Sequence, residues 1–249
     1  MKKILFLSLA LTLSVGLWAE TQTVSYRYPV YNTDGDPASG IKEWKTGMVN
    51  ATVVENTTER VTWNAGWYVV NSTITLSQGA VCSGAVHLIL ADGATLTVTG
   101  DTYQAGITVS GNGNSLTIYG QTNQSGQLIA NGGSNAAGIG GGKEGPGSNI
   151  TINGGVVTTT GGYRGAGIGG GYEGSGSNIT INGGKVTAKG GDYASGIGSG
   201  TSGNGSSIII TEGTVIATGG LMGAGIGGGS LGSGTDITIT GGTVTATGG

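Results

Sequence analysis

The stretch Gly165–Gly171 reads "GAGIGGG", a single isoleucine among glycines apart from one alanine. Taken alone it matches G-x-G-x-x-G, the turn that binds dinucleotide phosphates, which follows a strand, opens a helix and occurs once per fold. Here related copies end at Gly142, Gly200 and Gly229. A phosphate-binding turn has no reason to recur at a fixed interval. The motif therefore predicts a repeated structural unit and no nucleotide cofactor.

The copies recur at a strict interval of 29 residues. This step separates Ile139, Ile168, Ile197 and Ile226. The same step aligns the isoleucines of "NITINGG", at Ile179 and Ile181, with their counterparts in the other copies, and it aligns Val157, Val186, Val215 and Val244. Residues 134–249 thus form four units without insertion or deletion. A period between 20 and 50 residues is typical of stacked supersecondary units.

Each unit contains three short runs of alternating residues separated by glycine-rich corners, and no helical pattern. In "KVTAK", Val186 and Ala188 point inward and the lysines and threonine point outward. We expect an all-β fold, a single-stranded right-handed parallel β-helix (solenoid) with three short strands per 29-residue coil. In "GAGIGGG", Ala166 and Ile168 point inward. The outward positions carry no side chain, which predicts a bare glycine face repeated once per coil.

The N-terminus predicts a secreted protein. Residues 1–19, "MKKILFLSLALTLSVGLWA", have the charged start and short apolar run of a signal peptide, with cleavage expected after Ala19. No other stretch is apolar enough to cross a bilayer, so no transmembrane segment is expected in the mature chain. Without Lys2 and Lys3 the chain has 8 basic and 13 acidic residues and no basic patch, which argues against a nucleic-acid partner. The single cysteine, Cys82, excludes an internal disulfide.

The remaining chain divides by composition. Residues 20–62 are expected to form an N-terminal cap over the open first coil, with Trp63 and Trp67 sealing its core. Residues 63–133 are expected to be irregular first β-helix coils, and residues 134–249 to be four regular ones. No capping run follows the last unit. We therefore expect a further C-terminal segment, or a partner, to cover the open last coil.

The repeats carry a family resemblance. "WNAGWYVVNSTITL", "VHLILADGATLTVTG", "NSLTIYGQ" and the repeated "GAGIGGG…GSNITINGG" resemble secreted bacterial (Bacteroides-type) GAGIGGG-repeat proteins over about residues 63–249. Such proteins are grouped with carbohydrate-binding, pectate-lyase-like right-handed β-helices. The resemblance implies the fold and a surface or adhesin-like role, because few of these proteins have an assigned activity.

No complete catalytic or metal-binding set is found. "NTDGD" at 32–36 resembles a polygalacturonase motif, but its companions are missing and the composition favours a turn. Glu144 and Glu173 align in adjacent coils, yet Ser202 and Leu231 follow, so a solvated charge pair is favoured over a cation site. His87 is expected to point outward and has no second histidine, and Cys82 has no companion. We expect no catalytic residue, no metal and no cofactor.

Candidate binding residues occupy two loop positions where the repeat varies. These positions flank the bare glycine face and predict two rims along a shallow trough. The candidates are Lys143, Glu144, Tyr163, Arg164, Tyr172, Glu173, Asp192 and Tyr193. Tyrosine rings suit stacking on sugars, and charged groups suit hydrogen bonds to hydroxyls. The alternative is that these are ordinary solvated loop residues.

The sequence favours a secreted or cell-surface β-helix repeat protein, non-catalytic, that acts as an adhesin-like or carbohydrate-binding module with a polysaccharide or host glycan as partner. The alternative is a polysaccharide lyase or glycoside hydrolase of the pectin-lyase-like superfamily. A third class is ice binding, because outward threonines such as Thr158 and Thr187 form ladders. Ile209 and Ile216 interrupt these ladders, which disfavours that class.

Overall fold

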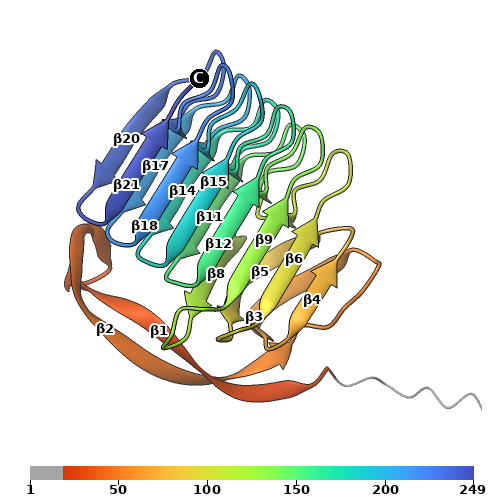
Figure 1. Cartoon of the computed structure of the whole chain (residues 1–249), viewed down its shortest axis with the longest axis vertical. Coiled ribbons are helices and arrows are strands. Elements are labelled where there is room, and N and C mark those ends of the chain that lie inside the picture. Colours follow the sequence, from red (N-terminus) through yellow and green to blue (C-terminus); the bar gives the residue numbers. More distant parts are fainter. Residues whose placement is uncertain (1–18) are drawn as a thin grey trace, which may run out of the picture.

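The chain winds into a stack of similar coils with a long hairpin beside it (Figure 1). The computed structural model describes residues 19–249, so the expected signal peptide lies almost wholly outside the described residues. Strands are the only regular elements in that part of the chain. They are β1 (Thr21–Thr33), β2 (Asp36–Val53), β3 (Val61–Val70), β4 (Thr73–Leu76), β5 (Ala80–Leu90), β6 (Thr95–Thr99), β7 (Ile107–Thr108), β8 (Ser115–Gly120), β9 (Gln127–Asn131), β10 (Ile139–Gly140), β11 (Gly147–Ile152), β12 (Val156–Thr160), β13 (Ile168–Gly169), β14 (Gly176–Ile181), β15 (Lys185–Lys189), β16 (Ile197–Gly198), β17 (Gly205–Ile210), β18 (Thr214–Thr218), β19 (Ile226–Gly227), β20 (Gly234–Ile239) and β21 (Thr243–Thr247).

Successive coils pair in parallel with the register that the 29-residue period predicts. In the short strands, Ile168 pairs with Ile139 on one side and with Ile197 on the other. The strand that follows pairs Ile179 with Ile208, and the third pairs Val186 with Val215. The expected right-handed parallel β-helix with three short strands per coil is confirmed.

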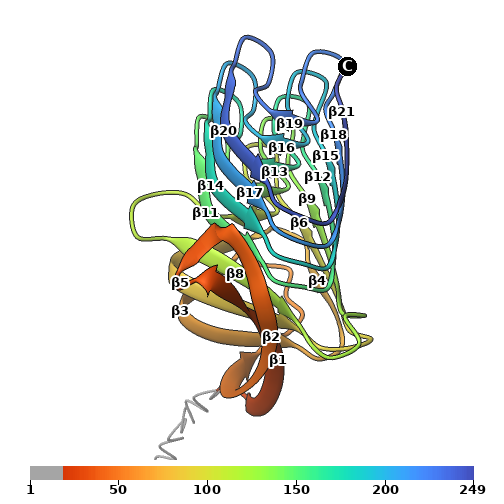
Figure 2. The ribbon, with the colours of Figure 1, turned by 90° about the vertical axis from the view of Figure 1, so that its left-hand side faces the viewer.

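The three strand columns form two sheets. The third strands build a seven-stranded sheet from β4 to β21, and the other two columns, together with β1 and β2, form a fourteen-stranded sheet. These two columns join at β5, whose Ala80 pairs with Ile107 of β7 while Val86 pairs with Leu116 of β8. In the later coils a loop interrupts this strand and separates its two halves (Figure 2).

Inward-facing aliphatic side chains form continuous columns along the axis. They belong to one buried cluster that extends from Val54 to Ala217. Ile168, Ile179 and Val186 are each fully buried, and so are their counterparts in the next coil. Each such side chain contributes about 1.5–3 kcal/mol by leaving water. A single coil has no second layer to bury them against, so each coil is stabilised by its neighbours.

A buried polar ladder lies at the corner between the second and third strands of the coils. Asn182 Nδ2 donates to Asn153 Oδ1 at 2.8 Å, and Thr211 Oγ1 donates to Asn182 Oδ1 at 2.9 Å. All three side chains are buried. A buried amide without partners is costly, so this ladder favours only the register in which equivalent residues stack.

Two non-glycine positions in each regular coil have left-handed backbone. One holds Asn149, Asn178, Ser207 and Asp236, with φ between 51° and 57°. Asparagine tolerates this conformation better than most residues. Its side chain also forms a surface ladder, because Asn178 Nδ2 donates to Asn149 Oδ1 at 3.3 Å. The ladder ends where serine replaces asparagine at position 207.

The hairpin β1–β2 runs along the outside of the coils and does not cap their end (Figure 1). At its base, Val24 and Ala51 pack on Val69, Ile89 and Tyr119. Towards its tip, Trp44 Nε1 donates to Glu212 Oε2 at 3.0 Å, and Asn182 Nδ2 donates to the Tyr31 hydroxyl at 2.8 Å.

The expected cap over residues 20–62 therefore needs correction. Only the chain after Thr52 begins the first coil, where Thr52 and Val53 pair in parallel with β3. Most of the segment is instead a two-stranded ribbon. Such a ribbon is marginal alone and is stabilised here by the apolar outer surface of β3, β5 and β8. Its partner lies elsewhere in the chain, so local composition did not reveal it.

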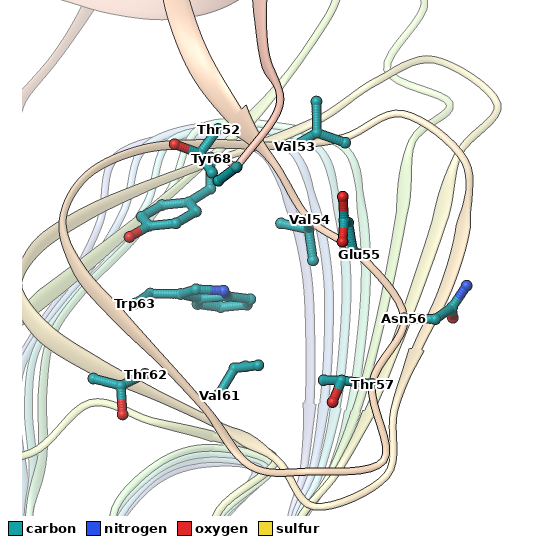
Figure 3. Close-up of a pocket in the computed structure, with 11 residues that line it drawn as sticks. Thr52, Val53, Val54, Glu55, Asn56, Thr57, Val61, Thr62, Trp63 and Tyr68 are labelled. Carbon is teal, nitrogen blue, oxygen red and sulfur yellow. The ribbon is translucent and has the colours of Figure 1, made fainter. Parts of the chain in front are cut away.

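The two tryptophans that were expected to seal the core have different places. Trp63 lies inside the loop of the first coil, between Tyr68 and Val61, and is 4% exposed (Figure 3). A pocket of about 490 Å³ borders it. Trp67 instead lies on the outer face, with its ring centroid 4.6 Å from that of Tyr26. Only Trp63 fills the end of the core.

Extending the asparagine ladder is expected to stabilise the protein. The change Ser207→Asn places a residue suited to φ near 50° beside Asn178 and supplies one more hydrogen bond. We expect a gain of about 0.5–1 kcal/mol in the free energy of unfolding, measured by urea denaturation. Ser206→Asn, at a neighbouring position without positive φ, is the control and gives no such gain. Equal effects of the two variants contradict this account.

His87 is expected to make stability depend on pH below about 6.5. It is the only histidine, its ring stacks on Trp67 at 4.3 Å, and Nδ1 lies 3.1 Å from the Tyr119 hydroxyl. Burial lowers the pKa of His87. The unfolded chain therefore binds a proton first, near pH 6.5, and stability falls as the pH drops through and below that value.

Urea denaturation at pH 7.5 and pH 5.5 measures this effect. The change His87→Gln removes the titrating group and should flatten the stability profile between these two pH values. An equally steep profile in the variant assigns the effect to carboxylates instead.

Candidate functional site

The glycine face of the short strands is closed. Gly167 and Gly169 are buried. A Cβ atom on Gly169 would lie 1.8 Å from the carbonyl oxygen of Gly198 in the next coil. On Gly167 it would lie 2.6 Å from the Gly196 oxygen and 2.8 Å from the Lys189 nitrogen. The predicted open trough is therefore wrong. Neighbouring backbone fills the space expected to hold solvent, and only glycine permits this approach.

Two loops stand beside each short strand. We name the loop before it loop A (161–166 in the coil of β13) and the loop after it loop B (170–175). Loop B of each coil donates a hydrogen bond to loop A of the preceding coil. These bonds run from Tyr172 N to Asn135 O at 2.9 Å, from Thr201 N to Arg164 O at 3.2 Å and from Ser230 N to Tyr193 O at 2.8 Å.

These bonds join the two expected rims into one continuous surface. Figure 2 shows the loops stacked along one edge of the β-helix. We name this surface the crest; it comprises loops A and B within residues 100–106, 132–137, 141–146, 161–166, 170–175, 190–195, 199–204, 219–224 and 228–233. Its backbone is held by main-chain bonds within and between coils, so its side chains project from a rigid base.

Four of the predicted binding residues form one cluster on the crest. The rings of Tyr163 and Tyr193, from adjacent coils, meet edge to face with centroids 5.2 Å apart. The Arg164 guanidinium lies 4.8 Å from the ring centroid of Tyr172 and 6.0 Å from that of Tyr163. Such cation–π contacts contribute about 0.5–1 kcal/mol at exposed sites. These contacts hold Arg164, a loop A residue, beside Tyr172 of loop B in the same coil.

The other predicted residues surround this cluster. Lys143 Nζ forms an ion pair with Glu144 at 3.0 Å and lies 5.6 Å from the ring centroid of Tyr103. Glu173 and Asp192 are exposed. The ion pair raises the pKa of Lys143, and the hydrogen bond to Glu173 raises the pKa of Tyr172. A hydrogen bond with Tyr193 likewise raises the pKa of Tyr163, so these hydroxyls stay protonated at neutral pH.

The sequence interpretation missed Tyr103 and the lining of a pocket beside Arg164. Tyr103 precedes the regular repeats, so the 29-residue step does not align its loop with the later ones. The sequence "AGITV" that follows it resembles the repeated "AGIGG" and could have identified the loop. The pocket has a volume of about 290 Å³. It is lined by Arg164, Tyr172, Tyr193, Thr201, Ser202, Ser230 and Leu231. These residues come from three successive coils, and only the fold brings them together.

The residues considered for catalysis lie in a hairpin turn, in a surface ion pair and in the core. In "NTDGD", Asp34 and Gly35 form the turn of the β1–β2 hairpin, with φ of 72° at Gly35, which confirms the turn interpretation. Glu144 forms an exposed ion pair with Lys143. Cys82 is buried, and burial raises the pKa of its thiol to about 12, so it is a poor nucleophile at neutral pH.

Residues 19–249 offer neither a clustered metal site nor a membrane-spanning helix. That part of the chain holds no group of three or more His, Cys, Asp or Glu side chains placed to bind a metal ion. It also contains no helix of the length and apolarity needed to cross a membrane.

Comparison with known proteins supports the repeat architecture. A family model described as "Beta helix repeat" matches residues 124–143, 150–172, 179–201, 208–230 and 237–249. The later segments follow the 29-residue step; in the regular coils the matches include loop A and the first residues of loop B. No curated protein and no solved structure matches the chain.

Alanine at Gly167 tests whether the glycine face is closed. Gly167 has an ordinary φ, so Gly167→Ala adds only a steric clash with Gly196 and Lys189. We expect a loss of about 3 kcal/mol in the free energy of unfolding. Gly248→Ala, where the nearest atom is 3.4 Å away, is the control and changes stability by less than about 0.5 kcal/mol. An unchanged stability of the Gly167→Ala variant would contradict the closed face and support the open trough expected from the sequence.

Proposed function

We propose that this β-helix repeat protein is a secreted or cell-surface module that binds glycans through its crest and is not an enzyme. The observation that carries the proposal is the cluster of Tyr163, Tyr172 and Tyr193, which lies on a rigid surface and includes Arg164. Tyrosine offers a flat apolar face and a polar edge, which suits a sugar ring with its C–H face and its hydroxyls.

The crest is suited to an extended ligand. Successive coils are separated by the spacing of paired strands, about 4.8 Å, so equivalent loop residues recur at that step along the axis. Tyr163 and Tyr193 occupy neighbouring steps, and Lys143 with Tyr103 continues the polar and aromatic surface in earlier coils. A polysaccharide or host glycan lying along the axis would contact several coils at once, as an adhesin requires.

The expected signal peptide supports a location outside the cytoplasm, where glycans are accessible. The enzymatic alternative, a lyase or hydrolase of the pectin-lyase-like type, needs carboxylates free to act on the glycosidic bond. The aligned pair Glu144 and Glu173 does not favour it, because Glu144 is engaged by Lys143.

Alanine at the three crest tyrosines tests the proposal. The variant Tyr163→Ala/Tyr172→Ala/Tyr193→Ala removes the stacking faces and leaves the core columns intact. We expect tenfold weaker binding or more on a glycan array, since aromatic truncations at binding centres cost about 2 kcal/mol each. The control is Thr158→Ala/Thr187→Ala on the outer face of the seven-stranded sheet. Unchanged binding by the tyrosine variant refutes the crest as the glycan site.

A further inference from the structure

The pocket beside Arg164 is small and partly enclosed by the crest. Its volume is about 290 Å³, at the lower limit of the roughly 300–1,000 Å³ typical of ligand pockets. Such a volume suits a single ring and not a long segment of chain. Arg164 and Tyr172 belong to one coil, Tyr193, Thr201 and Ser202 to the next, and the remaining lining to a third.

Arg164 is the only charged residue that lines this pocket. Within residues 19–249 it forms no salt bridge, whereas the neighbouring crest cation Lys143 is paired with Glu144. The Arg164 Cζ lies 4.8 Å from the Tyr172 ring centroid, a cation–π contact that keeps the guanidinium beside the pocket. The N–H groups along its edge remain able to donate two parallel hydrogen bonds to one anionic group.

The rest of the lining complements a sugar ring. Ser202 and Ser230 supply hydroxyls that both donate and accept hydrogen bonds, and Leu231 supplies an apolar wall. The Thr201 hydroxyl donates to Tyr193 O at 3.4 Å and supplies an acceptor. The main chain at these positions is fixed before any ligand binds. Thr201 N donates to Arg164 O at 3.2 Å, and Ser202 N donates to Ser230 O at 2.7 Å. Little ordering is therefore required on binding.

We infer that this pocket binds one sugar unit that bears an anionic substituent, a carboxylate or a sulfate, with the anion on Arg164 and the ring beside Tyr172 and Tyr193. The inference rests on the proposed glycan-binding function and specifies its ligand class. Neutral units of the same glycan would contact the neighbouring crest tyrosines. The pocket would therefore fix the position of the glycan along the crest by its charged unit.

The experiment compares, for each of three sugar backbones, probes that differ only at C6. Hexasaccharides with glucan, galactan and mannan backbones are prepared in neutral, C6-carboxylate and C6-sulfate forms, and binding to the full chain is measured by calorimetry. We expect at least one anionic form to bind about tenfold more tightly than its neutral parent, the effect of a hydrogen-bonded charge. Carboxylate and sulfate probes distinguish the two sources of the charge. Added salt should weaken this preference.

Three variants locate the effect. Arg164→Gln should abolish the anionic preference, so that anionic and neutral probes bind this variant with equal affinity, and Arg164→Lys should retain only part of it, because lysine lacks the planar fork. Lys143→Gln makes the same charge change on the crest outside the pocket and should retain the preference. Equal losses in the Arg164→Gln and Lys143→Gln variants overturn the inference, since the attraction is then diffuse.

The outcomes separate the two proposals. Neutral and anionic probes that bind equally well, with binding lost in the tyrosine variant, overturn the anionic pocket and leave glycan binding intact. Failure of every probe to bind overturns both.

Discussion

Close contact between backbone segments of neighbouring coils is the constraint on which this structure depends. At the short strands, the main chain of one coil lies against the next coil and against its own third strand, with no space for a Cβ atom at Gly167 or Gly169. The aliphatic columns supply the free energy, about 1.5–3 kcal/mol for each side chain. Gly167 and Gly169 permit this close approach of the short strands, and beside them loop B of one coil donates a hydrogen bond to loop A of the preceding one.

Periodicity made the fold predictable from the sequence. The 29-residue step predicted that Ile168, Ile179 and Val186 lie beside identical residues of the next coil. The parallel strands pair in that register in the structure. The hairpin was not predictable in the same way. Its contacts, Trp44 with Glu212 and Tyr31 with Asn182, join residues more than 150 positions apart, and nothing in residues 20–62 repeats with those partners. A cap was the natural expectation for a segment of different composition.

The sequence identified residues of the candidate site but did not predict the shape of the surface on which they lie. Variation of loop residues within a constant frame indicated Tyr163, Arg164, Tyr172 and Tyr193, which lie together in the structure. Alternation suggested that outward glycines face solvent, and this was wrong because neighbouring backbone at Gly196, Gly198 and Lys189 lies against Gly167 and Gly169. Whether a glycine is bare or packed against backbone depends on the path of the chain in the neighbouring coil. Side-chain periodicity carries no information on that path.

The in-register stacking has a consequence for how such a chain changes over generations. Because equivalent residues of all regular coils lie on one line, an insertion or deletion of 29 residues would add or remove a whole coil and leave the remaining coils in parallel register. Such a change would lengthen or shorten the crest and alter the order of the loop residues along it. The hairpin is the part that limits it, because its contacts are made to Asn182 and Glu212 of particular coils.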